Sequence, residues 1–324
     1  MKIVARSARW VAVVMLLLAG AAWAQGYPTK PIRWVVGFPA GSAGDILARA
    51  TGPHLTEKWG QPVIVENRPG AGGNLGADVV AKAPPDGYTL LMGTVSSHSI
   101  NPTLYAKMPY DAIKDFVPVT LVASAPNLLV VPPSLPVNST AELIALAKAR
   151  PGQFTFGSAG NGTTLHLSGE LFKRMAGVDM VHVPYRGTPQ AMPDLLSGQI
   201  SLMFAPVPAV LPQVKEGRLK ALAITSTNRS ALLPELPTVA ETGLPGFEAV
   251  AWNGVFVPAG TPEDIVRLLN REMVRIIALP ELRERLTALG FDPGGNTSEQ
   301  FAAKVKADME KWAKVIRESG ARVD

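Results

Sequence analysis

A glycine-rich turn, Gly157–Glu170 (G-S-A-G-N-G-T-T-L-H-L-S-G-E), constrains the fold of this chain most. It follows the strand-like residues Gln153–Phe156 and leads into the helix-like residues Leu165–Met175. A second such turn, Phe38–Asp45 (F-P-A-G-S-A-G-D), follows the strand-like residues Ile32–Gly37. A turn between a strand and a helix leaves backbone N–H groups unpaired at the positive end of the helix, where an anion is stabilised. We predict that the two turns face each other across a cleft and hold a small carboxylate.

Strand-like and helix-like segments alternate through the first third of the chain. The expected strands are Ile32–Phe38, Pro62–Val65 and Tyr88–Met92, and the expected helices are Asp45–Trp59 and Ala77–Ala83. A polar loop, Gly93–Asn101, is expected beyond the third strand and contains Ser96 and Ser97. Strands and helices that alternate with short loops predict an α/β fold with a parallel, doubly wound sheet.

Two long β-branched segments, Phe116–Val131 and Phe247–Val257, interrupt this alternation. The elements expected between them are a helix from the capping box Ser139-x-x-Glu142 to Ala149, the strand Gln153–Phe156, the helix Leu165–Met175, the strand Met180–Pro184, a helix around Pro189–Leu196, the strand Ile200–Phe204, a helix near Val207–Val214 and the strand Leu219–Ile224. We therefore predict two α/β lobes joined by a hinge of two crossing strands. Domain I would comprise residues 25–122 and 252–324, and domain II would be the insertion 123–251.

The C-terminal part of the chain is expected to be helical. Thr261-Pro262-Glu263-Asp264 predicts a helix start with threonine as N-cap and proline at the first helical position. Thr297-x-x-Gln300 opens the last helix. The charged residues of that helix, expected on its solvated surface, are Lys304, Lys306, Asp308, Glu310 and Lys311. Trp252, on the returning strand, is expected to pack in the hinge.

Residues 1–24 have the pattern of a secretory signal peptide. The positive residues Lys2, Arg6 and Arg9 precede the apolar stretch Val11–Ala22, and Ala22-Trp23-Ala24 fits a cleavage site. The alternative, a membrane anchor, needs about 20 apolar residues, which is more than this stretch provides. We therefore predict export to the periplasm with cleavage after Ala24. The chain has no cysteine, which excludes disulfides, a thiolate metal site and a cysteine nucleophile.

The charge of the chain argues against a nucleic-acid partner. Without the three basic residues of the signal peptide, the 31 Lys and Arg residues fall to 28, against 26 Asp and Glu. No basic run or basic–aromatic stripe remains, so nucleic-acid binding is not expected. No two histidines have the spacing of metal ligands, and neither turn is followed by the Lys-Ser/Thr of a phosphate-binding loop. We predict no metal and no cofactor.

An exported α/β hydrolase is the alternative class. Both turns miss the nucleophile-elbow pattern G-x-S-x-G by one residue, because each lacks the first glycine before Ser42 or Ser158. A catalytic triad would also need a histidine. His98, in the expected polar loop, is the better candidate, whereas His166 lies inside the expected helix and is predicted to pack or to cap it.

Several polar residues of the turns can also be interpreted as helix caps. They are Ser42, Asp45, Ser158, Asn161, Thr163 and Thr164. The binding interpretation is favoured because four segments follow strands: the two turns, Thr94–Ser97 and Tyr185-Arg186-Gly187. Ligands of open α/β sheets lie beyond the carboxyl ends of the strands. Asp45 would repel a carboxylate unless it caps its own helix or accepts a hydrogen bond from the ligand. Arg186 is the one cation in these segments, and its alternative is an ordinary surface residue.

At several of these motifs the chain resembles a known family, the periplasmic solute receptors of tripartite tricarboxylate transporters, also called Bug receptors. The matching stretches are Tyr27–Ile32, Phe38–Asp45, Asn67–Gly73 (N-R-P-G-A-G-G), Pro85–Leu90 (P-D-G-Y-T-L), Gly157–Glu170, Val183–Gly187 (V-P-Y-R-G) and Trp252–Gly260. They cover essentially the whole mature chain in the expected order. The resemblance implies a type II periplasmic-binding-protein fold of two α/β lobes, no catalytic activity, and possible transporter subunits as partners.

The resemblance also implies a ligand class and its contacts. The ligand would be a small carboxylate, such as a dicarboxylate, a tricarboxylate, an acidic amino acid or an aromatic acid, held by backbone amides and short polar side chains. Together with the residues singled out above, the predicted ligand-binding set is Phe38, Ala40, Gly41, Ser42, Asp45, Ser96, Ser97, Ser158, Ala159, Gly160, Asn161, Gly162, Thr163, Tyr185 and Arg186. Where the family often has A-G-G-x-x-D, this chain has A-G-S-A-G-D, so Ser42 adds a hydroxyl group.

Overall fold

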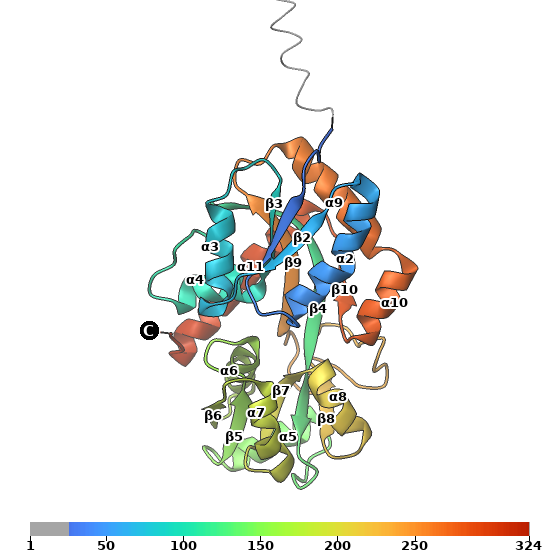
Figure 1. Ribbon diagram of the computed structural model, residues 1–324. Coiled ribbons are helices and arrows are strands. Elements are labelled where there is room, and N and C mark those ends of the chain that lie inside the picture. Colours follow the sequence, from blue (N-terminus) through green and yellow to red (C-terminus); the bar gives the residue numbers. More distant parts are fainter. Residues whose placement is uncertain (1–25, 324) are drawn as a thin grey trace, which may run out of the picture.

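The computed structural model describes residues 26–323, which form two α/β lobes (Figure 1). The predicted signal peptide and its cleavage site lie outside the described residues. In Figure 1 the upper lobe contains both the start and the end of the described chain, and the lower lobe contains the middle of the sequence. None of the helices within residues 26–323 is long and apolar enough to span a membrane.

The upper lobe is built on a mixed sheet with the strand order β2-β1-β3-β9-β4. Strands β1, β2 and β3 are parallel, and β9 is antiparallel to both β3 and β4. The strands are β1 (Ile32–Val36), β2 (Val63–Asn67), β3 (Thr89–Thr94), β9 (Val250–Pro258), the first part of β4 (Phe116–Val131) and the short β10 (Asp292–Pro293). The helices are α2 (Ala43–Trp59), α3 (Asn74–Ala81), α4 (Asn101–Leu104), α9 (Glu263–Ile277), α10 (Pro280–Ala288) and α11 (Ser298–Ser319).

The lower lobe continues the same sheet from the end of β4. There β4 pairs with β7 on one side and β8 on the other, and β5 lies between β7 and β6. The strands are β5 (Phe154–Ser158), β6 (Met180–Pro184), β7 (Leu202–Pro206) and β8 (Lys220–Ile224), and the helices are α5 (Thr140–Ala149), α6 (Thr164–Ala176), α7 (Thr188–Ser197) and α8 (Val207–Lys215).

Strand β4 links the two lobes. Residues 116–126 pair with β9 in the upper lobe, and residues 127–131 pair with β7 and β8 in the lower lobe. The register of β4 against β9 shifts twice, between Pro118 and Thr120 and between Leu121 and Ala123. β-bulges of this kind bend and twist a strand locally. The chain returns to the upper lobe at the start of β9, so the hinge consists of two crossing strands.

Helices cover both faces of the upper sheet because alternate residues of its strands point to opposite faces. Trp34 and Val36 of β1 belong to a buried core that contains Leu47 of α2, whereas Val35 belongs to the core that contains Val80 of α3. The second of these cores continues into the lower lobe. Its members there include Leu129, Phe156, Phe172, Phe204 and Phe247.

The prediction that Trp252 packs in the hinge is confirmed, but the prediction that Asp308 lies on the solvated surface of the last helix is wrong. Trp252 is fully buried, and its Nε1 atom donates a hydrogen bond to Asp308 Oδ2 at 2.8 Å. Asp308 of α11 is only 4% exposed and also pairs with Lys304 and Lys311. It is therefore a buried acceptor and not an ordinary surface residue.

Two local predictions were also wrong, and a third is confirmed only in part. Most of Gly93–Asn101, predicted as a polar loop, forms a π-helical turn (Ser96–Ile100) that runs directly into α4. The Thr261 hydroxyl donates to the Pro258 carbonyl oxygen instead of capping α9. The Ser139 hydroxyl accepts from the Glu142 amide at 3.1 Å and caps α5 as predicted, but the Glu142 side chain accepts from the Asn138 amide and not from the Ser139 amide, so only half of the capping box forms. Helix α10 was not predicted.

Candidate functional site

The first turn joins β1 to α2 and ends in a capped helix. Ser42 is the N-cap residue, in extended conformation (φ −69°, ψ 162°), and its side-chain oxygen accepts from the Asp45 amide at 3.4 Å. This cap pairs the third N–H group of the helix. The first two, on Ala43 and Gly44, have no hydrogen-bond partner among residues 26–323. Ala43 is half-buried and Gly44 is buried, and their two unpaired donors lie at the positive end of the helix, where an anion is stabilised.

Asp45 stabilises the turn instead of facing solvent. Its carboxylate is 4% exposed and accepts from the Gly41 amide (2.9 Å), Arg49 Nε (2.9 Å) and Asn67 Nδ2 (3.0 Å). Burial alone would favour the neutral carboxyl, but these three donors hold the pKa of Asp45 below its ordinary value of 3.8. The predicted conflict with a bound anion is therefore reduced, because the negative charge is already paired.

Replacing Asp45 with asparagine should destabilise the protein at neutral pH. Hydrogen bonds to charged groups contribute about 1.5–3 kcal/mol, so we expect a loss of about 2 kcal/mol in the free energy of unfolding. Because the pKa is lowered on folding, this contribution is present above pH 3.8 and is lost as the pH falls through the folded-state pKa. Urea unfolding at pH 7 and pH 3 should show a difference between Asp45→Asn and wild type that shrinks in acid. An unchanged difference would contradict the prediction.

A third glycine-rich turn, which the sequence-based site did not include, lies against the first one. Asn67 Nδ2 also donates to the Phe38 carbonyl oxygen at 3.0 Å. A Cβ atom built on Gly73 would lie 2.9 Å from the Phe38 ring and 3.7 Å from Ser97 Cβ. Phe38, Gly73 and Ser97 are therefore neighbours. The signal for this contact was present in the sequence as N-R-P-G-A-G-G at Asn67–Gly73.

The predicted serines after β3 differ in their exposure. Ser96 is half-buried, whereas Ser97 is 3% exposed. The Ser97 hydroxyl accepts from the Thr94 amide (3.1 Å) and lies 2.9 Å from His98 Nδ1. The Ser97 side chain therefore makes hydrogen bonds within the π-helical turn and its flanking residues.

The second turn joins β5 to α6 and repeats the geometry of the first. Thr163 is the N-cap residue (φ −70°, ψ 157°), and its hydroxyl accepts from the His166 amide at 3.4 Å. The first two N–H groups of the helix, on Thr164 and Leu165, have no hydrogen-bond partner among residues 26–323. Ala159 and Gly160 are half-buried, and the side chain of Asn161 is exposed. The chain therefore presents two capped helix starts with the same free donors.

Ser158 is paired with a histidine that the sequence reasoning did not select. Its side chain is fully buried, its Oγ atom accepts from the Gly160 amide (3.1 Å), and it lies 2.6 Å from His182 Nε2. This pair forms because β5 and β6 are parallel neighbours. In their register His182 lies opposite Phe156, which is two residues before Ser158 on the same strand. His98, the histidine considered for a triad, is fully buried and stacks on Phe256 with ring centroids 3.9 Å apart.

Tyr185 and Arg186 follow β6 beside the second turn. The Tyr185 amide donates to the Ser158 carbonyl oxygen at 3.0 Å, and the Tyr185 hydroxyl is fixed by Asp194 Oδ2 at 2.6 Å. Arg186 is exposed, and its guanidinium has no ion pair or hydrogen bond to any residue in the described part of the chain. Arg186 is thus a cation available next to the turn.

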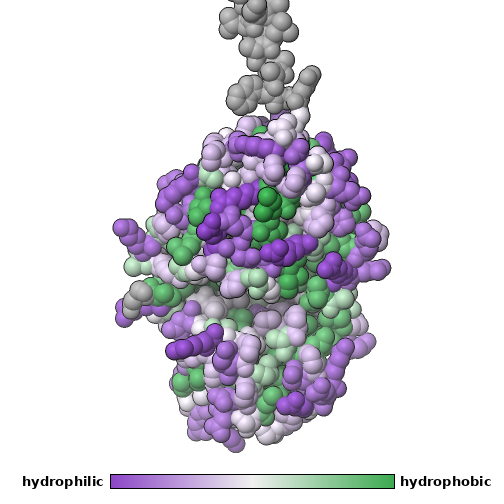
Figure 2. All heavy atoms as spheres, viewed as in Figure 1, coloured by the Kyte–Doolittle hydropathy of each residue, from purple (hydrophilic) through white to green (hydrophobic). Residues whose placement is uncertain are grey.

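Contacts between the lobes bring the second turn against the upper lobe. A Cβ atom built on Gly162 would lie only 2.1 Å from Leu104 Cδ2 of α4. Farther along α6, Arg174 pairs with Glu318 of α11 at 3.0 Å. Helix α4 also borders the third turn, where Asn101 Nδ2 donates to the Gly72 carbonyl oxygen (3.0 Å), so α4 contacts both the second and the third turn, and the third turn contacts the first. Figure 2 shows the surface hollowed between the two lobes.

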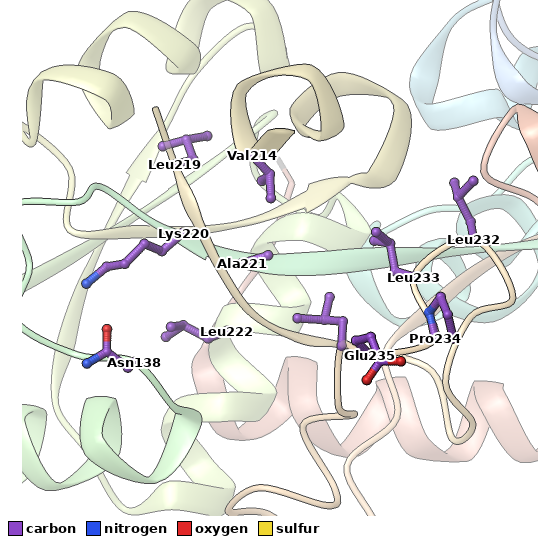
Figure 3. Close-up of a pocket in the computed structure, with 11 residues that line it drawn as sticks. Asn138, Val214, Leu219, Lys220, Ala221, Leu222, Leu232, Leu233, Pro234 and Glu235 are labelled. Carbon is purple, nitrogen blue, oxygen red and sulfur yellow. The ribbon is translucent and has the colours of Figure 1, made fainter. Parts of the chain in front are cut away.

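A separate cavity lies in the lower lobe, away from this junction. Its volume is about 520 Å³, and Figure 3 shows it between β8 and the segment 232–236. Its lining is mainly apolar and includes five leucines, and its charged groups are Lys220 and Glu235. None of the predicted ligand-binding residues lines it. Within residues 26–323, no cluster of three or more histidine or acidic side chains could hold a metal ion.

Comparison with known proteins agrees with this architecture. The family model described as "Tripartite tricarboxylate transporter family receptor" matches residues 47–321. Protein BugT of Bordetella pertussis is 38% identical over 321 residues, which are 97% of this chain and 98% of BugT. The structure of R. palustris Rpa4515 with adipate superposes with a TM-score of 0.79 at 40% identity, covering 92% of this chain and all of that one. The structure of MatC from Rhodopseudomonas palustris with bound malate superposes with a TM-score of 0.74 at 34% identity, and the match covers 90% of this chain and all of MatC.

Two α/β lobes on a two-strand hinge, with the junction described above, define a solute-binding protein of the type II periplasmic-binding-protein fold. The chain belongs to the tripartite tricarboxylate transporter receptor family, which includes the Bug proteins. It is therefore a periplasmic solute-binding receptor and not an enzyme, and the hydrolase alternative is set aside despite the Ser158–His182 pair.

Proposed function

We propose that this receptor binds a small carboxylate between its lobes, at the first and second turns. The observation that carries the proposal is the repeated geometry of the two turns: each ends in a capped helix whose first two N–H groups are free. Each helix end stabilises a nearby anion by about 0.3–1 kcal/mol when exposed, and by up to about 2 kcal/mol when partly buried. Two such helix ends in a closed cleft, together with further amide hydrogen bonds, would bind one carboxylate group.

A second carboxylate would have its own partner in Arg186. This guanidinium is exposed and free of ion pairs, and it follows Tyr185, which is hydrogen-bonded to the second turn. Dicarboxylates are also the ligands in two similar structures, adipate in Rpa4515 and malate in MatC. We therefore favour a dicarboxylate within the carboxylate class. The proposed contacts are the backbone groups of residues 40–44 and 159–165, with Asn161 and Arg186 as side-chain contacts.

Binding would favour the closed arrangement of the lobes, because only there can one ligand contact both turns. The hinge in β4 and β9 supports a division into the proposed domains, residues 25–122 with 252–324, and residues 123–251. In this proposal the chain is exported, loses residues 1–24, and presents the captured solute to membrane transporter subunits or to a sensor.

A thermal-shift titration with adipate and malate tests the proposal. A ligand present at 100 times its Kd stabilises the folded state by about 2.7 kcal/mol. For a chain of this size we expect a rise in Tm of about 4 °C. Adipamide, which has the same carbon chain without charge, is the matched control and should give no shift. If neither diacid nor a wider set of small carboxylates raises Tm, the ligand class is wrong.

A further inference from the structure

Two histidine side chains lie in a stack behind the second turn. His166 is in the first turn of α6, and His182 is in β6. Their ring centroids are 3.9 Å apart with an interplanar angle of 17°. The His182 ring also stacks on Phe156, with centroids 4.9 Å apart. The relative position of the two imidazoles is therefore fixed by α6, which the turn opens, and by β6, which pairs with the strand before the turn.

Each ring holds a different polar group of the turn. Nε2 of His182 lies 2.6 Å from the Ser158 hydroxyl, which in turn accepts from the Gly160 amide at 3.1 Å. Nδ1 of His166 accepts from the Gly162 amide at 3.1 Å. Because Nδ1 of His166 is an acceptor, the proton of this ring is on Nε2. Gly162, whose amide His166 accepts from, is the residue that contacts Leu104 of the upper lobe.

The surroundings keep both rings neutral. Burial lowers the pKa of His166 to about 3, and a charge on His182 or Lys173 opposes its protonation further. Burial and Lys173 lower the pKa of His182 to about 4. Glu170, the acidic group next to the pair, lies 3.9 Å from His166 Nε2 and is itself paired with Lys173. Near neutral pH each ring therefore offers one lone pair and one N–H group.

We propose that His166 and His182 are positioning residues of the receptor, which hold the second turn in its ligand-binding shape through Ser158 and Gly162. This inference rests on the proposed function, because it assigns these two residues to the carboxylate site. Neither side chain needs to touch the ligand. Without the His166 acceptor the buried Gly162 amide is left unpaired, and without the His182 contact the Ser158 hydroxyl loses its side-chain partner.

Two pairs of variants separate hydrogen bonding from packing. His166→Asn keeps an acceptor near the position of Nδ1, whereas His166→Leu removes it. His182→Gln keeps a polar group near Nε2, whereas His182→Phe keeps the stack and removes the hydrogen bond. We expect the Asn and Gln variants to bind adipate within about threefold of wild type in calorimetric titration. The Leu and Phe variants should bind about tenfold more weakly or worse, which corresponds to the loss of one hydrogen bond.

The tautomer of His166 provides a readout that does not depend on variants folding. The chain has four histidines, so long-range ¹H–¹⁵N spectra of the wild-type rings are simple to assign. We expect His166 with its proton on Nε2 and Nδ1 unprotonated. A proton on Nδ1 would overturn the inference, because two donors would then face each other at Gly162.

The failures of the two proposals can be told apart. If wild-type protein binds no carboxylate, the proposed function fails. If wild type binds adipate, and His166→Leu and His182→Phe bind it equally well, the carboxylate site stands and the positioning role fails. Weaker binding by all four variants alike would also overturn the positioning role, because the hydrogen bonds would then not be what matters.

Discussion

Replacing Gly162 with alanine is expected to weaken adipate binding by about 30-fold or more. Gly162 adopts a left-handed conformation (φ 73°), and a Cβ atom there would lie 2.1 Å from Leu104 Cδ2 in the other lobe. Overpacking of this kind costs about 1–3 kcal/mol, and about 2 kcal/mol corresponds to 30-fold in Kd. Because the clash is between lobes, opening relieves it, and the penalty falls on the closed state that binds ligand. Isothermal titration calorimetry measures the effect directly.

Gly177, at the other end of the helix that follows Gly162, offers a matched control. Gly177 ends α6 with φ 62°, and nothing lies within 4 Å of a Cβ atom built there. Gly177→Ala therefore carries the same backbone strain without the contact between lobes, and its affinity should remain close to wild type. A double variant, Leu104→Ala with Gly162→Ala, should regain much of the lost affinity. If Gly162→Ala and Gly177→Ala bind adipate equally well, the second turn does not approach the upper lobe as described.

Replacing Asp308 with alanine is expected to lower the free energy of unfolding by about 3–5 kcal/mol. Breaking a buried charge pair by removing one partner has this effect, because the remaining groups stay buried and unpaired. Here Trp252 Nε1, 2.8 Å away, would lose its acceptor, and Lys304 and Lys311, at 3.3 and 2.8 Å, would keep only their longer contacts to Glu248 at 3.7 and 3.5 Å. Since both lysines are partly exposed and retain Glu248 as a partner, we expect a loss at the lower end of this range. Urea unfolding followed by tryptophan fluorescence checks it.

Glu310, two residues farther along α11, is the matched control. Its side chain is exposed and forms no ion pair within residues 26–323, so Glu310→Ala should change stability by less than about 0.5 kcal/mol. Asp308→Asn should lie between the two, because an amide oxygen can still accept from Trp252. Equal stability of the Asp308→Ala and Glu310→Ala variants would show that the buried contact with the hinge contributes nothing.

Much of the fold could be predicted from local sequence because local rules and tertiary structure agree there. The predicted bounds of Phe116–Val131 and Met180–Pro184 are confirmed, as is the helix start at Thr297, where both hydrogen bonds of the capping box form. The two glycine-rich turns were also found at strand-to-helix junctions. In each case the signal lies within a few residues: β-branched runs, prolines, glycines and capping side chains.

The features that were missed depend on partners far away in sequence. Asp308 has the spacing of the buried face of its helix, between Val305 and Trp312, but its charge suggested a surface residue, and the acceptor role that burial requires depends on Trp252, 56 positions earlier. The π-helical turn at Ser96–Ile100 holds buried polar groups that need Tyr110 and Phe256 around them. His182 was passed over because its contact with Ser158 requires the parallel register of β5 and β6. The predicted ligand contacts remain predictions.

The sharing of β4 has a consequence for how the protein unfolds. A single strand supplies hydrogen bonds to the sheets of both lobes, and one apolar core extends from Val80 in the upper lobe to Phe172 in the lower one. Melting either lobe would remove a neighbouring strand and part of the interior of the other. The two halves therefore form one cooperative unit, so a ligand that touches only their junction protects the whole chain against denaturation and proteolysis.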